Sequence, residues 1–150
     1  MSDKLNSEAL KIGGQISILQ KFHRRFITAF LSDSGLSGTM HMILTTLTEH
    51  PGVSQDYLSA RFNMDKGIIA RQCKALEEAD LIRREVNEND RRQYCLYLTE
   101  QGKQQVPVIM EGYQKWSNLI CNGFSEEETD LACRLLARMV DNCRNDLGDL

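Results

Sequence analysis

The chain has 150 residues, of which 41% are hydrophobic and 26% are charged, and its formal net charge is −3. This size and composition are typical of one ordinary globular domain that buries its own core. No apolar run reaches the ~20 residues that cross a bilayer, and the first residues lack the hydrophobic segment of a signal peptide. We therefore expect a cytoplasmic protein with no membrane partner, and mild acidity does not exclude nucleic acid as a partner.

The first part of the chain is predicted to be helical. Residues 5–31 carry apolar side chains at helical spacing, and the helix-weakening glycine pair at 13–14 favours a regular helix only after it. Residues 32–38 have the composition of a turn. A second helix is expected over residues 39–50, where the Pro-Gly pair at 51–52 ends it.

Two further helices are predicted with clear N-caps. Ser54 caps a short helix over residues 55–62, with an apolar face of Tyr57, Leu58 and Phe62. Asp65 caps a longer helix over residues 66–79, in which positions i, i+4 and i+7 predict a buried stripe of Ile69, Cys73 and Leu76. The face left to solvent then consists of Gly67, Ala70, Arg71, Lys74 and Glu78.

The remaining elements are two strands and two helices. Residues 81–86 and 94–98 are predicted strands, joined by a polar loop with two adjacent arginines. Thr99 or Glu100 begins a long helix that Pro107 is expected to kink. Ser125 and three following glutamates begin a last helix, expected to run to about Arg144. Its predicted apolar stripe is Leu131, Leu135, Met139 and Val140.

This order of elements predicts a mainly α fold (α+β) built around a winged helix-turn-helix. In such an arrangement the longer helix enters the major groove of B-DNA, and the hairpin loop lies over the adjacent minor groove. Arg91 and Arg92 at the loop tip would supply guanidinium groups where the potential of the duplex is most negative. The predicted partner is therefore double-stranded DNA.

The stretch from about Val53 to Gly102 resembles the MarR family of regulators. The likeness is carried by "LSARFNMDKGIIARQCKALEEADLI" and, above all, by "NDRRQYCLYLTEQG". The second segment matches the family's wing pattern of Asp-x-Arg, a short strand and Leu-Thr-x-x-Gly, at Asp90, Arg92, Leu98, Thr99 and Gly102. Outside this stretch the likeness rests on the layout of the long helices alone.

The resemblance implies a homodimer in which the long N- and C-terminal helices of two chains intertwine as a dimer base. Residues 1–150 would then form a single MarR-like domain, with the winged-helix lobe at about 38–98 and dimerisation helices at about 5–31 and 100–146. Two lobes would bind a near-palindromic operator whose half-sites lie ~34–36 Å apart.

The resemblance also assigns DNA-binding roles to residues of the wing and the recognition helix. Arg92 matches the arginine that enters the minor groove and Asp90 the acidic residue that braces it, whereas Arg91 would contact phosphate on its charge alone. The family often has Ser or Thr where this chain has an apolar start to the helix, so base reading would fall mainly to Lys66, Arg71 and Lys74, with Gln72 at the margin. The predicted DNA-binding set is Ser54, Lys66, Gly67, Ala70, Arg71, Lys74, Asp90, Arg91 and Arg92.

One further departure from the family pattern precedes the first wing strand. The family's usual glycine is Asp80 here. Aspartate tolerates the left-handed backbone conformation better than most residues, so the turn is expected to survive.

Family members often bind small aromatic or anionic effectors in a cleft between the dimer base and the lobe. The candidate effector residues are His23, Arg24 and Trp116, and the alternative for each is packing in the core or the dimer. The three histidines have no partners at metal-ligand spacing, so neither a metal nor another cofactor is expected.

The cysteines allow a redox alternative. The chain has five cysteines without a CxxC pair, which predicts free thiols rather than a disulfide framework. The peroxide-sensing branch of the family has a reactive cysteine in its first helix, whereas this chain has none before Cys73. Packing is therefore favoured for Cys73 and Cys95.

The sequence thus predicts a sequence-specific DNA-binding transcriptional regulator, a homodimeric repressor released by a small molecule. One alternative is a winged-helix protein-interaction module without DNA binding, which the equal numbers of basic and acidic residues between positions 54 and 98 would suit. A cysteine-based redox-responsive regulator is the other. The sequence shows no nucleophile–base pair or glycine-rich phosphate loop, so an enzyme is not expected.

Overall fold

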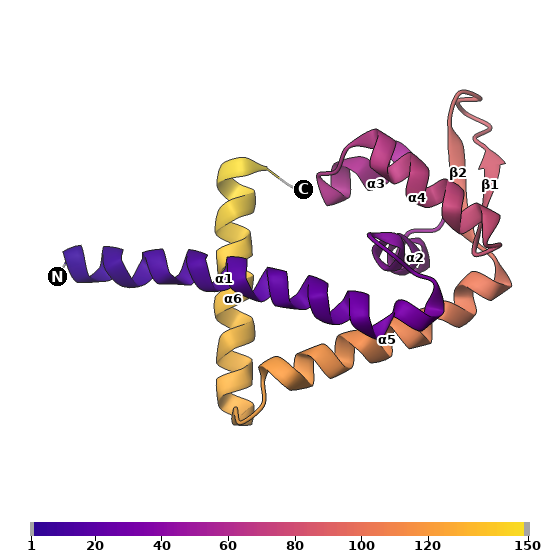
Figure 1. Ribbon diagram of the computed structural model, residues 1–150. Helices are drawn as coiled ribbons and strands as arrows, with labels where there is room; N and C mark the ends of the chain where they lie inside the picture. Colours follow the sequence, from indigo (N-terminus) through magenta and orange to yellow (C-terminus); the bar gives the residue numbers. More distant parts are fainter. Residues whose placement is uncertain (1, 149–150) are drawn as a thin grey trace.

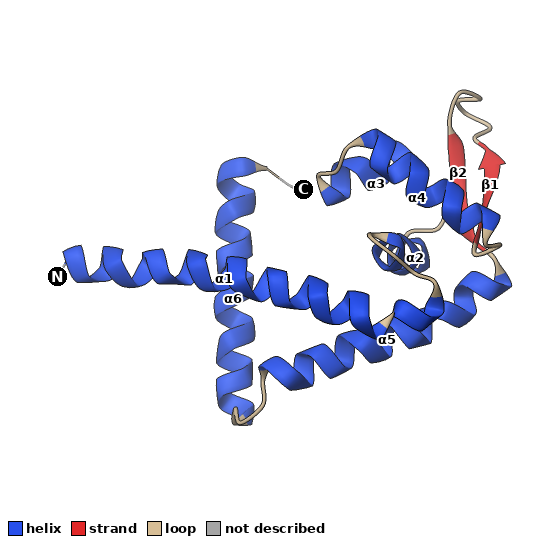
Figure 2. Cartoon of the chain, in the orientation of Figure 1, coloured by secondary structure: helices blue, strands red, loops and turns tan. Residues whose placement is uncertain are grey.

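The computed structural model describes the backbone of residues 2–148 and the side chains of residues 8–148, so the ends of the predicted domain lie outside the described residues. Figures 1 and 2 show a helical chain with one β-hairpin, which confirms the predicted fold class. The elements are α1 (Ser2–Phe30), η1 (Ser32–Ser34), α2 (Met40–Glu49), α3 (Gln55–Phe62), α4 (Lys66–Glu78), β1 (Ile82–Val86), β2 (Tyr94–Leu98), α5 (Glu100–Ile120) and α6 (Glu126–Leu147).

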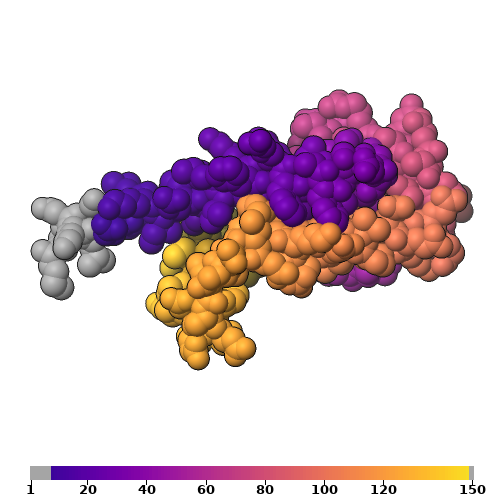
Figure 3. Space-filling model, turned by 60° about the horizontal axis from the view of Figure 1, so that its bottom comes forward, coloured from indigo at the N-terminus to yellow at the C-terminus, as the bar shows by residue number. Residues whose placement is uncertain are grey.

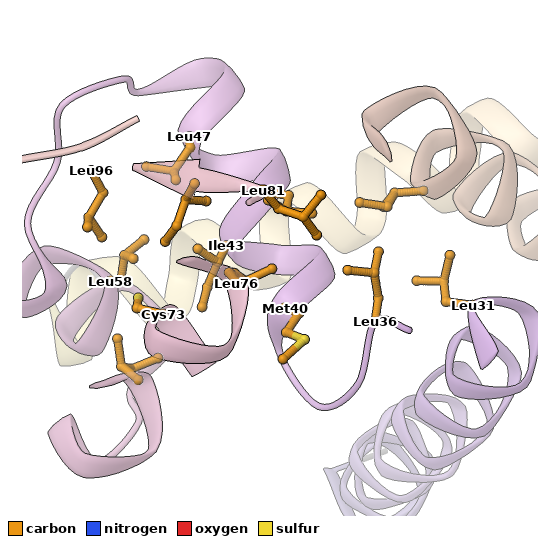
Figure 4. Packing of buried hydrophobic residues seen from close by; sticks show 14 of the residues in the cluster. Leu31, Leu36, Met40, Ile43, Leu47, Leu58, Cys73, Leu76, Leu81 and Leu96 are labelled. Carbon is orange, nitrogen blue, oxygen red and sulfur yellow. The ribbon is translucent and has the colours of Figure 1, made fainter. Parts of the chain in front are cut away.

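The winged lobe encloses the main core. Side chains from α2, α3, α4 and β2 meet there, as Figure 4 shows for Ile43, Leu58, Leu76 and Leu96. The predicted stripe on α4 is confirmed, because Ile69, Cys73 and Leu76 are all fully buried. Of the predicted apolar face on α3, Leu58 is buried and Phe62 half-buried, whereas Tyr57 is exposed and its ring lies near that of His50.

The hairpin is tied to the lobe along both of its strands. β1 and β2 pair antiparallel, with Ile82 opposite Leu98 and Val86 opposite Tyr94. On the other side of β2, Leu96 accepts a hydrogen bond from Gly52 and donates one to Val53, at 2.8 and 3.0 Å. The segment before α3 therefore pairs with β2, and this fixes the wing relative to the helix-turn-helix.

The Leu-Thr-x-x-Gly pattern forms the junction between the hairpin and α5. The Thr99 hydroxyl accepts a hydrogen bond from Gly102 N and donates one to the Asp80 carbonyl, at 3.0 and 2.6 Å. A Cβ at Gly102 would lie 1.9 Å from the Leu81 carbonyl oxygen, so only glycine fits. Asp80 has φ 56°, as predicted for the position where the family has glycine.

The long helix α1 does not begin where the glycine pair suggested. The helix is continuous from Ser2 through Gly13 and Gly14 to Phe30, so the expected later start is wrong. Each glycine costs only ~1 kcal/mol relative to alanine, too little to end a helix that otherwise keeps its hydrogen bonds. Near its other end α1 packs closely on α5, where a Cβ at Gly112 would lie 2.7 Å from the Phe30 ring.

The last helix runs across α1 in Figure 1, and in Figure 3 it projects from the body formed by α1, α5 and the lobe. Ser125 caps α6 in a capping box with Glu128, as predicted. None of the residues of α6 is buried, and its apolar side chains are largely exposed, among them Leu131, Leu135 and Val140. No helix within residues 2–148 is long and apolar enough to span a membrane.

Candidate nucleic-acid interface

The helix-turn-helix is set by two side-chain caps. Ser54 Oγ accepts a hydrogen bond from Tyr57 N at 3.1 Å, which starts α3. Asp65 Oδ1 accepts hydrogen bonds from Gly67 N and Ile68 N at 2.8 and 3.3 Å, which starts α4. Both predicted caps are confirmed, and α3 and α4 pack together with α4 on the outside of the lobe (Figure 1).

The outer face of α4 carries the predicted reading residues. Lys66, Gly67, Arg71 and Lys74 are exposed, and Ala70 is half-buried. Arg71 Nη1 lies 3.7 Å from the position that a Cβ of Gly67 would occupy, so the guanidinium extends along the helix toward its N-terminus. The lack of a side chain at Gly67 leaves this end of α4 open to close approach by a ligand.

The cations of this surface fall into two groups. Lys66 Nζ lies 2.9 Å from Asp56 Oδ1, and Lys74 Nζ lies 3.7 Å from Glu78 Oε1. In contrast, Arg71, Arg91 and Arg92 have no carboxylate within ion-pair distance among the described side chains. The three arginines therefore present their full charge, whereas the two lysines are partly neutralised by neighbours.

The Gln72 side chain contacts the turn before α2. Its amide packs against Gly38 in the turn before α2, where a Cβ on the glycine would meet Nε2 at 3.1 Å. Gln72 Oε1 is buried without a hydrogen-bond partner among the described residues. The half-buried Gln72 side chain thus packs toward the turn before α2, and its place at the margin of the DNA face stays a prediction.

The wing loop is ordered by two asparagine- and aspartate-based turns. Asn87 Oδ1 accepts from Asn89 N at 2.9 Å, and Asp90 Oδ1 accepts from Arg92 N at 3.0 Å. Asp90 therefore holds the backbone of Arg92, and among the ion pairs of the described side chains there is none between these two. Arg91 and Arg92 are both exposed at the tip, on the side of the lobe away from α1 and α5 (Figure 1).

Two contacts that the sequence did not suggest hold the wing strands in place. Arg84 Nε lies 2.9 Å from Glu77 Oε2, an ion pair between β1 and α4. On the opposite face, the Arg83 guanidinium lies 4.8 Å from the centre of the Tyr97 ring and pairs with Glu85. Neither the Arg84–Glu77 pair nor the Arg83–Tyr97 contact had a local signal, because the first depends on how β1 packs on α4 and the second on the register of the hairpin.

The predicted effector residues are only partly brought together. The His23 and Trp116 rings lie 5.2 Å apart, where α1 meets α5. Arg24 lies on another side of α1, beside Ser17, Gln20 and Lys21. Sequence reasoning did not find the half-buried pair of His41 and Tyr113, whose Nδ1 and Oη share a hydrogen bond of 2.7 Å.

Burial changes the acid–base properties of this aromatic group. Burial, assisted by the charge of His23, lowers the pKa of His41 to about 4. Burial also lowers the pKa of His23 and raises that of Tyr113. Both imidazoles are therefore neutral at pH 7.

A cavity of about 1060 Å³ lies between the lobe and α6. Its walls come from α1, α2, α3, α5 and α6, and they are mostly apolar, with Tyr113, Glu49 and Arg61 among the polar groups. His23, Arg24 and Trp116 do not line it. The cavity lies between the elements assigned to base and lobe, but on different residues from those predicted.

The cysteines differ in burial, since Cys73 is buried whereas Cys133 and Cys143 are exposed. Cys73 is fully buried, and burial raises the pKa of its thiol to about 11, so it stays protonated at neutral pH. All five cysteines are free thiols. Within residues 8–148 there is no cluster of three or more histidine, cysteine or acidic side chains that could hold a metal ion.

Comparison with known proteins agrees with this geometry. The profile of the MarR family matches residues 36–94, which span the helix-turn-helix and most of the wing. A regulatory protein assigned to the hcr operon of Thauera aromatica is 29% identical over 126 residues, covering 84% of this chain and 74% of that protein.

Solved structures share the fold over nearly the whole chain. A crystal structure of MarR is 34% identical, with a TM-score of 0.80, and the match covers 89% of this chain and 93% of that one. A MarR family regulator from Listeria monocytogenes, solved in complex with a 26mer DNA, has a TM-score of 0.79 at 23% identity. That match covers 88% of each chain.

Proposed function

The chain belongs to the MarR family and is a DNA-binding transcriptional regulator of that type, and from this premise we propose that it acts as a homodimeric repressor of a near-palindromic operator. The observation that carries the proposal is the set of exposed arginines without carboxylate partners among the described side chains, one on α4 and two on the wing tip. The Listeria monocytogenes regulator, which has a similar fold, was solved in complex with a 26mer DNA.

The proposed contacts divide between two grooves. α4 would enter the major groove, where Arg71 reads base edges with Lys66 and Lys74, while Gly67 and Ala70 allow the helix to approach closely. The wing would place Arg92 in the adjacent minor groove and Arg91 on a phosphate, with Asp90 fixing the loop. The N-terminus of α3 at Ser54 would face the phosphate backbone.

The proposed dimer divides the chain into two parts. The lobe, at about 38–98, contains most of the buried residues of the described chain, which supports its treatment as the DNA-binding unit. The helices at about 5–31 and 100–146 would form the base with those of a second chain. The exposed apolar side chains of α6 support this assignment, because water-exposed leucine and valine on one helix face commonly mark an interface.

The proposed regulation uses the cavity between lobe and α6. A small molecule bound there would contact both parts and fix the separation of the two lobes, so that its binding and operator binding would be coupled reciprocally. An aromatic or anionic compound would suit the apolar walls with Arg61 and Tyr113 at hand. If such a ligand lowers the affinity for the operator, the protein without ligand occupies the operator, and for this reason we propose a repressor.

The experiment selects operators from a random DNA pool and then measures affinity by fluorescence anisotropy at several salt concentrations. Recovery of an inverted repeat is expected. Arg92→Ala should reduce both affinity and the slope of log K against log salt, by about 0.9 for each lost phosphate contact. Arg83→Ala is the matched control, since Arg83 stacks on Tyr97 and pairs with Glu85 instead. Failure to prefer any duplex over scrambled competitor would contradict the proposal and favour the protein-interaction alternative.

A further inference from the structure

The wing carries two apolar side chains that the lobe does not cover. Val86 and Tyr94 are cross-strand partners and form the last pair of the hairpin before its loop. Val86 is 53% exposed and Tyr94 is 48% exposed, whereas Leu96, two residues further along β2, is fully buried. Exposed apolar groups at this point of a hairpin have no role in the core.

The face on which they lie follows from the register of the strands. Alternate residues of a strand share a face, so Tyr94 lies on the face of Leu96, and Val86 on the face of Arg84. This face is turned toward α4, because Leu96 is part of the lobe core and Arg84 pairs with Glu77 of that helix. Val86 and Tyr94 continue this face beyond the lobe, toward the arginines at the tip.

The Tyr94 hydroxyl is available to a ligand. Within the described part of the chain, no group forms a hydrogen bond with it. Tyr97 lies on the opposite face of the same strand and is used within the protein. Its ring lies under the Arg83 guanidinium, and its hydroxyl oxygen lies 2.9 Å from where a Cβ of Gly52 would be.

We propose that Tyr94 donates its phenolic hydrogen to a phosphate of the DNA strand that separates the two grooves, while Val86 packs on the neighbouring deoxyribose. This inference rests on the proposed function. If α4 occupies the major groove and the tip occupies the adjacent minor groove, the sugar–phosphate strand between these grooves passes over the wing face that is turned toward α4. Tyrosine is among the side chains that bind phosphate oxygens.

The contact would make Tyr94 a positioning residue for the wing. A neutral donor on the phosphate strand fixes how the hairpin sits across the minor groove, without adding charge. Loss of this donor should therefore lower the affinity without changing the salt dependence of binding, whereas loss of an arginine changes both.

The test compares Tyr94→Phe with Tyr97→Phe on the operator recovered by selection. A hydrogen bond to a charged group is worth enough that its loss should weaken binding by about tenfold. The salt slope of Tyr94→Phe should equal that of the unsubstituted protein, whereas Arg92→Ala reduces it. Tyr97→Phe should bind as the unsubstituted protein does, and equal melting temperatures would show that both variants are folded.

A second arm locates the phosphate. Duplexes that each carry one neutral methylphosphonate are scanned along the strand between the grooves. At the contacted position the unsubstituted protein should lose affinity, and Tyr94→Phe should lose none beyond its own defect. Unchanged binding by Tyr94→Phe, or equal losses for both proteins at every position, would overturn the inference while leaving the proposed function intact. If the unsubstituted protein prefers no duplex, the proposed function fails first, and the two failures are thereby distinguished.

Discussion

The winged lobe and the last helix differ in how far their apolar side chains are buried. In the lobe, α2, α3, α4 and the hairpin bury leucines and isoleucines completely within one chain. In α6, Leu131, Leu135 and Val140 stay between 41% and 48% exposed, and no residue of the helix is buried. Fully burying such a side chain is worth ~1.5–3 kcal/mol. The lobe therefore buries its apolar side chains within the chain, whereas those of α6 are left largely exposed, which supports the proposed dimer base.

The largest effect is expected from charges on the exposed stripe of α6. The double variant Leu131→Glu/Leu135→Glu, at positions i and i+4 of one face, should be monomeric, because glutamates cannot be buried against a second chain without a large desolvation cost. Operator affinity should fall by roughly 100-fold or more, because the two half-sites no longer bind as one unit. Sedimentation equilibrium and anisotropy measure the two quantities.

Ala137→Glu provides the matched control. Ala137 is exposed and lies on the other side of α6 from Leu135, so the same kind of charge there should leave both the assembly and the affinity unchanged. A dimer that survives the double substitution would remove α6 from the interface. The difference between lobe and α6 would then require another explanation.

The next largest effect is expected where the lobe joins the base. Gly102→Ala should destabilise the protein by at least about 1–3 kcal/mol, because its Cβ would lie 1.9 Å from the Leu81 carbonyl oxygen and the backbone must move. Thermal unfolding at fixed protein concentration measures this loss.

At a second glycine, substitution by alanine should have the opposite effect on stability. A Cβ added at Gly13 would meet no atom within 4 Å beyond the nearby backbone of its own helix. Gly13→Ala in the exposed part of α1 should therefore stabilise by ~0.5–1 kcal/mol. Equal effects at both positions would mean that the close approach at the junction does not matter.

What the sequence could predict differs between local and distant features. The caps at Ser54, Asp65, Thr99 and Ser125 were all predictable, because each cap is made by a side chain within three residues of its partner. The wing pattern was predictable for the same reason. The effect of the glycine pair in α1 was overestimated, because the low helix propensity of two residues is too small to interrupt a long helix.

Distant contacts were out of reach of the same reasoning. His41 bonds to Tyr113, 72 residues away, and Gln72 packs on a glycine before α2. Neither pairing has a local signal, since both arise from how α2 lies against α4 and α5. The prediction of the site was therefore uneven, because the reading helix and wing were found from spacing, whereas the walls of the cavity beside α6 were not.

The smallest effect is expected at His41, where the lobe meets α5. Since burial lowers the pKa of His41 to about 4 from an ordinary value of 6.5, the unfolded chain binds a proton more readily than the folded one. The contribution of neutral His41 to the free energy of unfolding is therefore fully present above pH 6.5 and is lost progressively as the pH falls from 6.5 toward 4. The slope of the unfolding free energy against pH reports how many protons the chain takes up on unfolding. His41→Gln, which keeps a hydrogen-bonding group for Tyr113, should reduce this uptake by up to about one proton per chain between pH 6.5 and 4.

The control for this titration is Thr48→Ala, an exposed position of α2 where no titratable group is removed, and this variant should keep the slope of the unsubstituted protein. Chemical denaturation at pH 4.5, 5.5 and 7 measures the difference. A slope that is equal in both variants would show that protonation of His41 does not contribute to the loss of stability in acid.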